Sequence, residues 1–179
     1  FEVPYSRTKK MIVATTSEET QILFKLKDTA TKNGLELEFI NGHDAVEREP
    51  NLFAVSALVS PTTGIVDAAG LAASFQHQAE LNGASLALET KIAKITQNSK
   101  ILVSGTSGGE EFEAKFDFLI NAAGHGAHKL TKSYWPEAPP LPKNFAKGNY
   151  FSIAGKAPFQ TLIYPVPGTE SLGIHYTID

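Results

Sequence analysis

The first sixty residues alternate between apolar runs that suit strands and segments with helical periodicity. Thr16 and Glu19 form a T-x-x-E capping box, so a helix is expected to begin there. Apolar residues then recur at helical spacing until Gly34, which suits the left-handed position after a helix. A short second helix is expected at 44–49, before Pro50. The runs that predict strands here are 11–15 (MIVAT), 35–40 (LELEFI) and 52–60 (LFAVSALVS).

The middle of the chain predicts one helix followed by a β-meander. Asp67 is a suitable N-cap for a helix with an apolar stripe, and Gly83 ends that helix. Short alternating runs follow, separated by polar turns at Asn98-Ser99 and at 107–109. Such closely spaced runs are typical of antiparallel neighbours. The runs are 84–89, 91–96, 100–104 and 111–116.

The last third predicts a buried strand, a tight turn and a group of closing strands. The apolar run 118–121 (FLIN) leads through Ala122, Ala123 and Gly124 into a helix at 125–134. A Pro-rich connector, 136–144, precedes the last predicted strands, at 148–153, 161–166 and 172–178. Together the elements predict an α+β (mixed α/β) fold, in which the meander and the closing strands are antiparallel in character.

Composition excludes several classes of protein. The chain has 179 residues and a net charge of −3, with no basic stretch suited to nucleic acid. It has no cysteine, which excludes disulfides and thiolate metal sites. No apolar run approaches the roughly 20 residues of a membrane span. Because the chain begins with Phe1 and stops within a strand-like pattern, we expect it to be an internal piece of a longer protein.

Few positions suggest phosphate or metal binding. Neither G-x-G-x-x-G nor G-x-x-x-x-G-K-[ST] occurs, and the glycines of 105–109 lie between strands, where a hairpin turn explains them. The turn at 122–124 ends a strand and opens a helix, so either a ligand that approaches the backbone or close packing explains its small residues. His125 and His128 have no third ligand at a matching spacing, so no metal site is predicted.

Three single residues have two possible explanations each. Asp67 is explained as an N-cap, although a carboxylate can also act as a ligand or base. Lys147 can neutralise an anionic substrate or can simply be solvated. His175 lies among large apolar residues of a predicted strand, where an imidazole needs a hydrogen-bond partner. A core histidine with a satisfied hydrogen bond and a catalytic base both fit this position.

Four strings along the chain resemble one family of flavoproteins. They are SPTTGIVDAAGLAASF from Ser60, FLINAAG from Phe118, AKGNYFSI from Ala146 and LIYPVPGTESLGIHYT from Leu162. Their order resembles the D-amino-acid-oxidase-like superfamily of FAD-dependent oxidoreductases, and is most similar to its L-2-hydroxyglutarate dehydrogenase/oxidase branch. The resemblance implies that 1–60 and 145–179 belong to a substrate-binding domain with an antiparallel or mixed sheet. It implies that 61–144 belong to the FAD-binding domain, meander included.

The resemblance also implies roles for residues of this chain. The backbone of Ile92 would meet the FAD adenine, and the turn at 122–124 (Ala122, Ala123 and Gly124) would lie close to the ADP portion. Tyr164 and His175 would face the substrate, whereas Tyr176 should point to the opposite face of the sheet. His175 would be the catalytic base, because an imidazole changes protonation near neutral pH. The further substrate-binding candidates are Thr63, Gly64 and Lys147.

The implied activity is oxidation of a 2-hydroxy acid, such as L-2-hydroxyglutarate, to the 2-oxo acid by hydride transfer to FAD. The alternatives are an amino-acid or amine oxidase of the same superfamily and a non-catalytic α+β binding module. The family's first βαβ unit is not recognisable here, so we expect this chain alone to be inactive and not to retain FAD. A small-molecule substrate and a cytoplasmic location, with membrane association left open, are expected, and no motif identifies the electron acceptor.

Overall fold

The computed structural model describes residues 2–140, 145–168 and 173–178 and divides into two compact units. One unit combines residues 1–77 with 151–179, and the other consists of 78–150. Helix α3 (Ala68–Leu81) crosses the boundary between them. The strands of the first unit are β1 (Tyr5–Ser6), β2 (Lys10–Ala14), β3 (Glu38–Asn41), β4 (Ser56–Ser60), β5 (Ile65–Val66) and β9 (Leu162–Pro165).

The first unit is built on a mixed four-stranded sheet with the order β3-β4-β2-β9. Strands β3, β4 and β2 pair antiparallel, whereas β9 lies parallel to β2. Ile12 is the register partner of both Leu58 and Tyr164. Beyond β9, Tyr176 forms an antiparallel bridge with Ile163, so the chain segment around Tyr176 continues the sheet. Strands β1 and β5 form a separate antiparallel pair.

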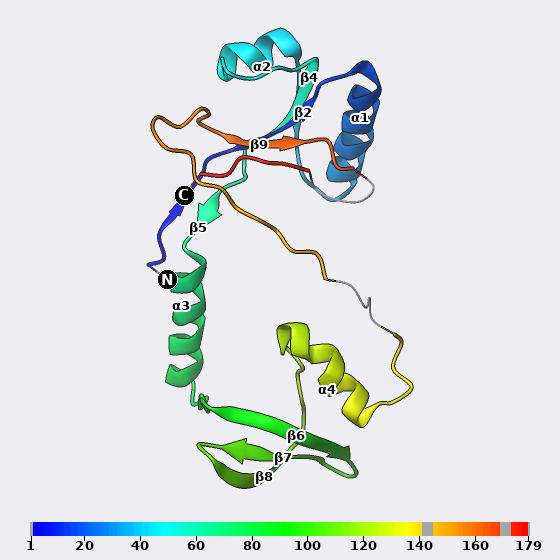
Figure 1. Ribbon diagram of the computed structural model, residues 1–179, viewed down its shortest axis with the longest axis vertical. Coiled ribbons are helices and arrows are strands. Elements are labelled where there is room, and N and C mark those ends of the chain that lie inside the picture. Colours follow the sequence, from blue (N-terminus) through cyan, green and yellow to red (C-terminus); the bar gives the residue numbers. More distant parts are fainter. Residues whose placement is uncertain (1, 141–144, 169–172, 179) are drawn as a thin grey trace. The chain divides into compact units, whose positions relative to one another are not determined.

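Helices α1 (Ser17–Lys32) and α2 (Gly42–Arg48) cover opposite faces of this sheet (Figure 1). Successive strand residues point to opposite faces, so each strand contributes to two separate hydrophobic clusters. One cluster joins the sheet to α2, and its members include Met11, Val13, Ala45, Ala57 and Ile163. The other joins it to α1, and its members include Ile12, Ala14, Leu23, Leu58 and Val166. The second face is called the α1 face below.

The capping box begins α1 as the sequence predicts. The backbone N–H of Glu19 donates to Thr16 Oγ1 at 3.2 Å. The Glu19 carboxylate accepts from the backbone and hydroxyl of Thr15, at 2.6 and 2.9 Å, and these hydrogen bonds lower the pKa of Glu19. Gly34 follows the helix with φ of 75°, a conformation that glycine adopts without strain. Asp67 likewise caps α3, because its Oδ1 accepts from the backbone N–H of Gly70 at 3.0 Å.

A buried carboxylate ties the start of β9 to the end of α2. Glu49 is only 2% exposed. It accepts hydrogen bonds from the backbone N–H groups of Gln160 and Thr161 and from Thr161 Oγ1, at 2.8–3.1 Å. Asn51 adds a bond from its Nδ2 to the carbonyl oxygen of Pro158 at 2.8 Å. These contacts join positions more than 100 residues apart and seat β9 at the edge of β2.

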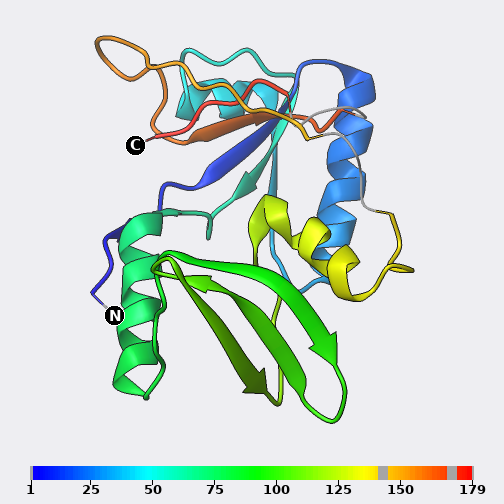
Figure 2. The same ribbon diagram turned by 60° about the horizontal axis from the view of Figure 1, so that its bottom comes forward.

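The second unit contains the predicted meander (Figure 2). Its strands β6 (Thr90–Gln97), β7 (Ile101–Ser107) and β8 (Glu110–Phe116) pair antiparallel in that order. The register shifts between Ile92 and Lys94, and a Cβ on Gly105, opposite this bulge, would lie 2.0 Å from the carbonyl oxygen of Lys91. A short 3-10 helix, η1 (Gly124–Gly126), leads into α4 (Ala127–Tyr134), which packs against β6.

The mixed fold class is confirmed, but several predicted strands are wrong. Residues 84–89, 118–121 and 148–153 form no strand. Phe118 and Ile120 are nearly 90% exposed, because no strand in the described part of the chain pairs with this apolar run. Strands β3 and β4 are shorter than predicted. Of the predicted strand 172–178, Leu172 lies outside the described residues, and the bridge at Tyr176 is what the remainder contributes to the sheet.

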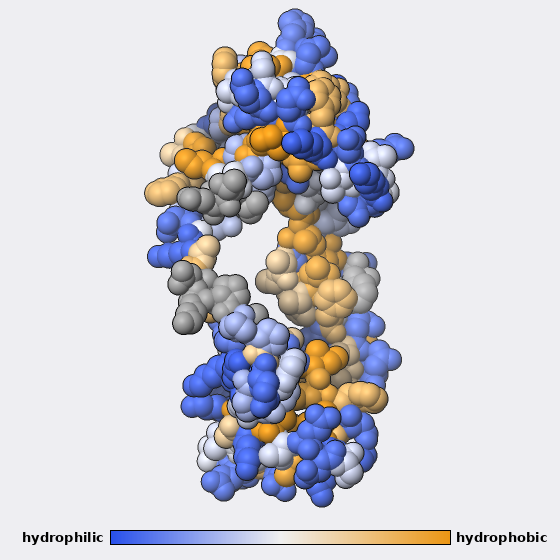
Figure 3. Space-filling model, turned by 90° about the vertical axis from the view of Figure 1, so that its right-hand side faces the viewer, coloured by the Kyte–Doolittle hydropathy of each residue, from blue (hydrophilic) through white to orange (hydrophobic). Residues whose placement is uncertain are grey.

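Hydrophobic side chains also reach the surface of both units (Figure 3). The division into compact units falls at 77/78 and 150/151 rather than at the expected domain boundaries. This division reflects packing within the chain and does not show which unit binds substrate or FAD. The assignment of 1–60 and 145–179 to a substrate domain, and of 61–144 to a FAD-binding domain, therefore stays a prediction.

Replacing Glu49 by alanine should destabilise the first unit substantially. Three partly buried donors would lose their acceptor, and each unsatisfied buried group costs about 1–3 kcal/mol. We expect Glu49→Ala to lower the free energy of unfolding by about 3 kcal/mol in urea titrations. Glu47→Ala, at an exposed position of the preceding helix α2, should change the free energy of unfolding by less than about 0.5 kcal/mol. Equal effects of the two variants would show that the Glu49 contacts do not hold β9.

Acid should weaken the ion pair between Glu38 and Arg48. Arg48 donates from Nη1 and Nη2 to the Glu38 carboxylate at 2.9 and 2.6 Å, and these hydrogen bonds lower the pKa of Glu38 from about 4.5. A carboxyl whose pKa is lowered on folding contributes stability above its unfolded pKa and loses it as the pH falls through the folded value. Unfolding free energy measured below pH 4.5 should therefore depend less steeply on pH in Glu38→Gln and in Arg48→Met. Unchanged slopes in both variants would contradict the assignment.

Candidate active site

Two aromatic rings predicted to face the substrate are stacked on each other. Tyr164 lies in β9, and the bridge between Ile163 and Tyr176 places His175 opposite Tyr164 in the next segment. The ring centroids are 4.5 Å apart with an interplanar angle of 15°. Both side chains are half-buried. The structure thus brings Tyr164 and His175 together, and their roles in chemistry stay predictions.

Tyr176 points to the other face of the sheet, as strand alternation predicts. Its partner Ile163 belongs to the cluster on the α2 face, whereas Tyr164 alternates with it and shares the α1 face with Ile12. The Tyr176 ring packs edge-on against Phe159 at 5.3 Å. One member of the His175–Tyr176 pair is therefore available to the α1 face, and it is the histidine.

The backbone near His175 sets its tautomer. Nδ1 lies 3.3 Å from the carbonyl oxygen of Gly173, and a carbonyl can only accept. Nδ1 therefore carries the proton, and the lone pair of the neutral ring lies on Nε2. Gly173 adopts φ of 72°, and a Cβ there would lie 2.5 Å from Cγ of Pro165. Glycine at this position keeps the segment close to β9.

A pocket on the α1 face lies over β2 and β4, and Lys10 connects it to Tyr164. Lys10 Nζ lies over the Tyr164 ring, 5.3 Å from its centroid, and Lys10 also lines the pocket. The cavity has a volume of about 270 Å³. Its lining residues are Lys10, Ile12, Leu35, Leu37, Leu58, Ser60, Thr62 and Thr63. The lining thus combines apolar side chains with one lysine and three hydroxyl-bearing residues.

Thr63 and Gly64 have different local explanations. Thr63 lines the pocket and donates from Oγ1 to Ser60 Oγ at 2.7 Å. Gly64 permits close packing, because a Cβ there would lie 2.5 Å from the carbonyl oxygen of Ser6. The small size of Gly64 is therefore explained by the β1–β5 pairing that carries the chain into the pocket wall.

Sequence reasoning missed Lys10. The signal for it was the alternation in β2, since residues 10, 12 and 14 share one face. The predicted cation, Lys147, belongs to the second unit, where it is exposed. It lies in a segment without regular structure, although a strand was predicted to follow it directly. Lys10 is therefore the lysine that the first unit places beside Tyr164.

The residues predicted to contact FAD lie in the second unit. Ile92 is half-buried in β6, next to the bulge, and Ala122 and Ala123 are exposed. Gly124 has φ of 54°, and a Cβ there would meet open space. Asn121 holds the turn, because its Nδ2 donates to the carbonyl oxygen of Ala127 at 2.8 Å. Small exposed residues on a fixed turn fit the close approach of a ligand to the backbone.

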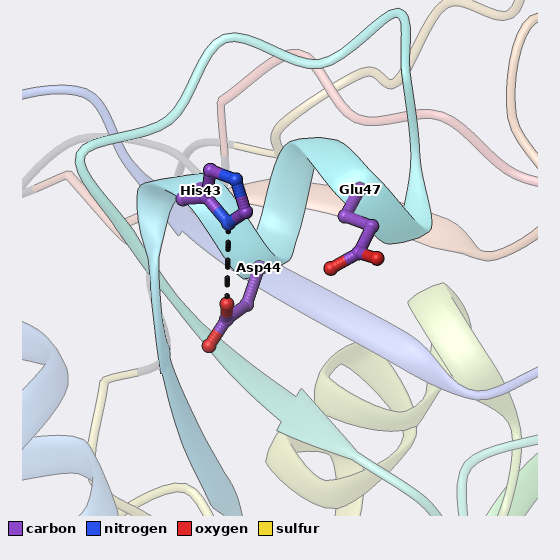
Figure 4. Close-up of side chains that lie close together, drawn as sticks. All are labelled: His43, Asp44 and Glu47. Atoms are coloured by element: carbon purple, nitrogen blue, oxygen red, sulfur yellow. Dashed lines mark hydrogen bonds and ion pairs between the residues drawn. The ribbon is translucent and has the colours of Figure 1, made fainter.

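Three side chains on α2 carry possible metal-ligating atoms (Figure 4). Ligand atoms of His43, Asp44 and Glu47 lie within 4.8 Å of one another. Asp44 already serves the start of the helix, since it exchanges hydrogen bonds with Asn41 at 2.9 and 3.0 Å. The helix packs on the face opposite Tyr164. This group is therefore separate from the candidate active site.

Comparison with known proteins identifies the family. Residues 1–178 match the model of the family described as FAD dependent oxidoreductase. The chain belongs to this family. A mitochondrial L-2-hydroxyglutarate dehydrogenase of Arabidopsis thaliana is 31% identical and aligns with all of the chain and 44% of its own length. An L-2-hydroxyglutarate dehydrogenase of Salmonella houtenae is 30% identical, over 98% of the chain and 42% of its own length.

Solved structures of other flavoenzymes share the fold. FAD-bound L-α-glycerophosphate oxidase from Mycoplasma pneumoniae covers 97% of the chain with a TM-score of 0.76 at 18% identity, and 47% of its own length is matched. L-proline dehydrogenase from P. horikoshii covers 78% of the chain, with 37% of its own length matched, and has a TM-score of 0.67 at 21% identity. The chain thus spans less than half the length of these relatives. Among the residues described, no helix has both the length and the apolar character needed to cross a membrane.

The stacking of Tyr164 on His175 predicts a ring-current effect in NMR spectra. We expect Tyr164→Leu to shift the imidazole resonances of His175 downfield, because protons above an aromatic face are shielded. Phe159→Leu removes a ring from the opposite face of the sheet and should leave these resonances in place. Equal responses to the two substitutions would contradict the stacked geometry.

Proposed function

We propose that a protein containing this chain oxidises a 2-hydroxy acid, with L-2-hydroxyglutarate as the leading substrate, to the 2-oxo acid. The observation that carries the proposal is the stacked pair of Tyr164 and His175, with the ammonium group of Lys10 beside the Tyr164 ring. Family membership supplies the redox class, and the names of the relatives at about 30% identity support the substrate. These relatives are more than twice as long as this chain, so we propose the activity for the longer protein that contains it.

The proposed roles follow from the atoms that the pair presents. His175 Nε2 carries the lone pair and accepts the proton of the substrate hydroxyl. Stacking on Tyr164 fixes the plane of the imidazole, and the Tyr164 hydroxyl donates a hydrogen bond to the carboxylate next to C2. The hydroxyl proton of the substrate thus passes to His175, and FAD, when bound, would accept the C2 hydride, which would balance a two-electron oxidation.

Ile92 and the turn at Ala122, Ala123 and Gly124 are the residues of this chain that would hold FAD. The small exposed side chains of the turn fit that role, as does the backbone of β6 near the bulge. Bound FAD supplies the hydride acceptor. The chain has no G-x-G-x-x-G motif, which in dinucleotide-binding folds places the pyrophosphate at a helix N-terminus. We therefore propose that the 179-residue chain by itself does not hold FAD tightly.

Amino-acid or amine oxidation is the second candidate, because solved structures with this fold include a glycine oxidase of Bacillus cereus and an L-proline dehydrogenase. An amine substrate would also need its proton removed before hydride transfer, so the His175 base suits both reactions. The Lys10 cation, which has no ion-pair partner among the described residues, favours the hydroxy dicarboxylate, since an α-amino group carries a positive charge near neutral pH.

The test is anaerobic reduction of the FAD-loaded protein that contains this chain. Addition of L-2-hydroxyglutarate should bleach the oxidised flavin absorbance, and His175→Ala should slow the bleaching by about 100-fold or more. His77→Ala removes an exposed imidazole of α3 and should keep the original rate. Bleaching by amino acids instead of hydroxy acids would support the second candidate, and an unchanged rate in His175→Ala would overturn the base assignment.

A further inference from the structure

Lys10 forms no ion pair with the part of the chain that the structure describes. The side chain is half-buried at the start of β2. The ion pairs found among residues 2–140, 145–168 and 173–178 join His43 to Asp44, Arg48 to Glu38 and Lys100 to Asp117, so none involves Lys10. Its ammonium group lies over the Tyr164 ring. A partly desolvated cation without a carboxylate favours the binding of an anion from solution.

Hydroxyl groups next to Lys10 can donate hydrogen bonds. Ser60 is the register partner of Lys10 on the neighbouring strand, and both line the pocket. Ser60 Oγ accepts a hydrogen bond from Thr63 Oγ1, and a serine hydroxyl that accepts can also donate its own proton. Thr62 adds an exposed hydroxyl. An ammonium group and hydroxyl donors together suit a carboxylate.

Apolar side chains line the rest of the cavity. Ile12, Leu37 and Leu58 contribute to it, and its volume is about 270 Å³. Leu58 belongs to β4 and Leu37 directly precedes β3, so both lie across β2 from β9. The methyl groups of Leu37 and Leu58 therefore report on a ligand that enters the cavity beside Lys10.

The order of the strands aligns this pocket with the Tyr164–His175 pair. β2 carries Lys10 on one side of β9, and the segment of His175 lies on the other side. Tyr164 thus lies between the cation and the proposed base. A linear molecule on the α1 face can reach Lys10 at one end and His175 at the other.

The backbone next to Lys10 is strained. Lys9 has φ of 59°, which is uncommon for a residue with a side chain, and its N–H donates to the carbonyl oxygen of Thr63 at 2.9 Å. This bond ties the start of β2 to the loop that carries Thr62 and Thr63. The strained residue therefore fixes the ammonium-bearing strand and the hydroxyl-bearing loop relative to each other.

We propose that Lys10 binds the second carboxylate of a dicarboxylic substrate and so selects dicarboxylates over monocarboxylates. The inference rests on the proposed function for the placement of the reacting end at His175. Lys10 replaces Lys147 as the cation of the site. Lys10, with the hydroxyls of Ser60 and Thr63 beside it, holds the remote carboxylate, and the methylene groups extend from there across β2 and β9 toward His175.

The first test measures binding without turnover. Glutarate should shift the methyl NMR signals of Leu37 and Leu58 in the 179-residue chain, and valerate, with the same carbon count and one carboxylate, should bind more weakly. Lys10→Met should weaken glutarate binding by about 10- to 100-fold, because it removes a charge-assisted hydrogen bond. Lys10→Arg should restore part of it. Lys25→Met, which removes an exposed lysine of α1, should leave glutarate binding unchanged.

A second variant guards against misfolding of the first. Ser60→Ala keeps the strand pairing and removes one proposed hydrogen-bond donor. It should therefore weaken glutarate binding severalfold and leave the NMR signals of residues outside the pocket unchanged. If glutarate shifts no pocket methyl, or if Lys10→Met and Lys25→Met bind it equally, the proposal is overturned.

The second test separates this inference from the proposed function. In the FAD-loaded protein containing the chain, Lys10→Met should lower kcat/KM for L-2-hydroxyglutarate at least about tenfold and leave that for L-2-hydroxyvalerate unchanged. Glutarate binding that depends on Lys10, without oxidation of any hydroxy acid, would support the pocket and refute the proposed function. Oxidation of L-2-hydroxyglutarate that is insensitive to Lys10 would support the function and refute the role of Lys10.

Discussion

The buried carboxylate of Glu49 is the contact on which the candidate site depends. Strand β9 returns to the sheet only after the chain has passed through the whole second unit, so no local turn sets its register. Glu49 fixes the position of this strand, because its carboxylate accepts hydrogen bonds from the two backbone N–H groups just before β9. The parallel register then places Tyr164 beside Ile12. His175 follows from the next pairing, through the bridge at Tyr176.

Elements set by nearby residues could be predicted from the sequence. The capping box at Thr16, the glycine after α1 and the N-cap at Asp67 all act over three or four residues, and each appears as predicted. The meander also follows from local turns. The runs 118–121 and 148–153 have the composition of strands, but a strand also needs a partner, and within the described residues none is paired with them. Amino-acid composition indicates a preference for the extended conformation, but it does not indicate which strand will pair with the segment.

The residues of the candidate site also differ in whether nearby sequence could identify them. Tyr164 and His175 were proposed from the motif resemblance, and strand alternation correctly placed Tyr176 on the other face. Lys10 could not be found this way, because its relation to Tyr164 depends on a parallel pairing between segments about 150 residues apart. Glycines of the same motifs also have packing roles: Gly64 admits the backbone of β1, and Gly173 admits Pro165, while the substrate contact of Gly64 stays a prediction. Motif membership alone therefore does not separate chemistry from packing.

The positions of Lys10 and His175 connect recognition of the substrate with its reaction. The two residues lie on opposite sides of β9, and the Tyr164 ring lies next to both side chains. On the proposed function, a dicarboxylate held by Lys10 at its remote end presents its hydroxyl-bearing end to His175. A monocarboxylate of equal length lacks the contact with Lys10, so its hydroxyl group would reach His175 in a smaller fraction of the bound molecules. The site would therefore discriminate in the chemical step as well as in binding.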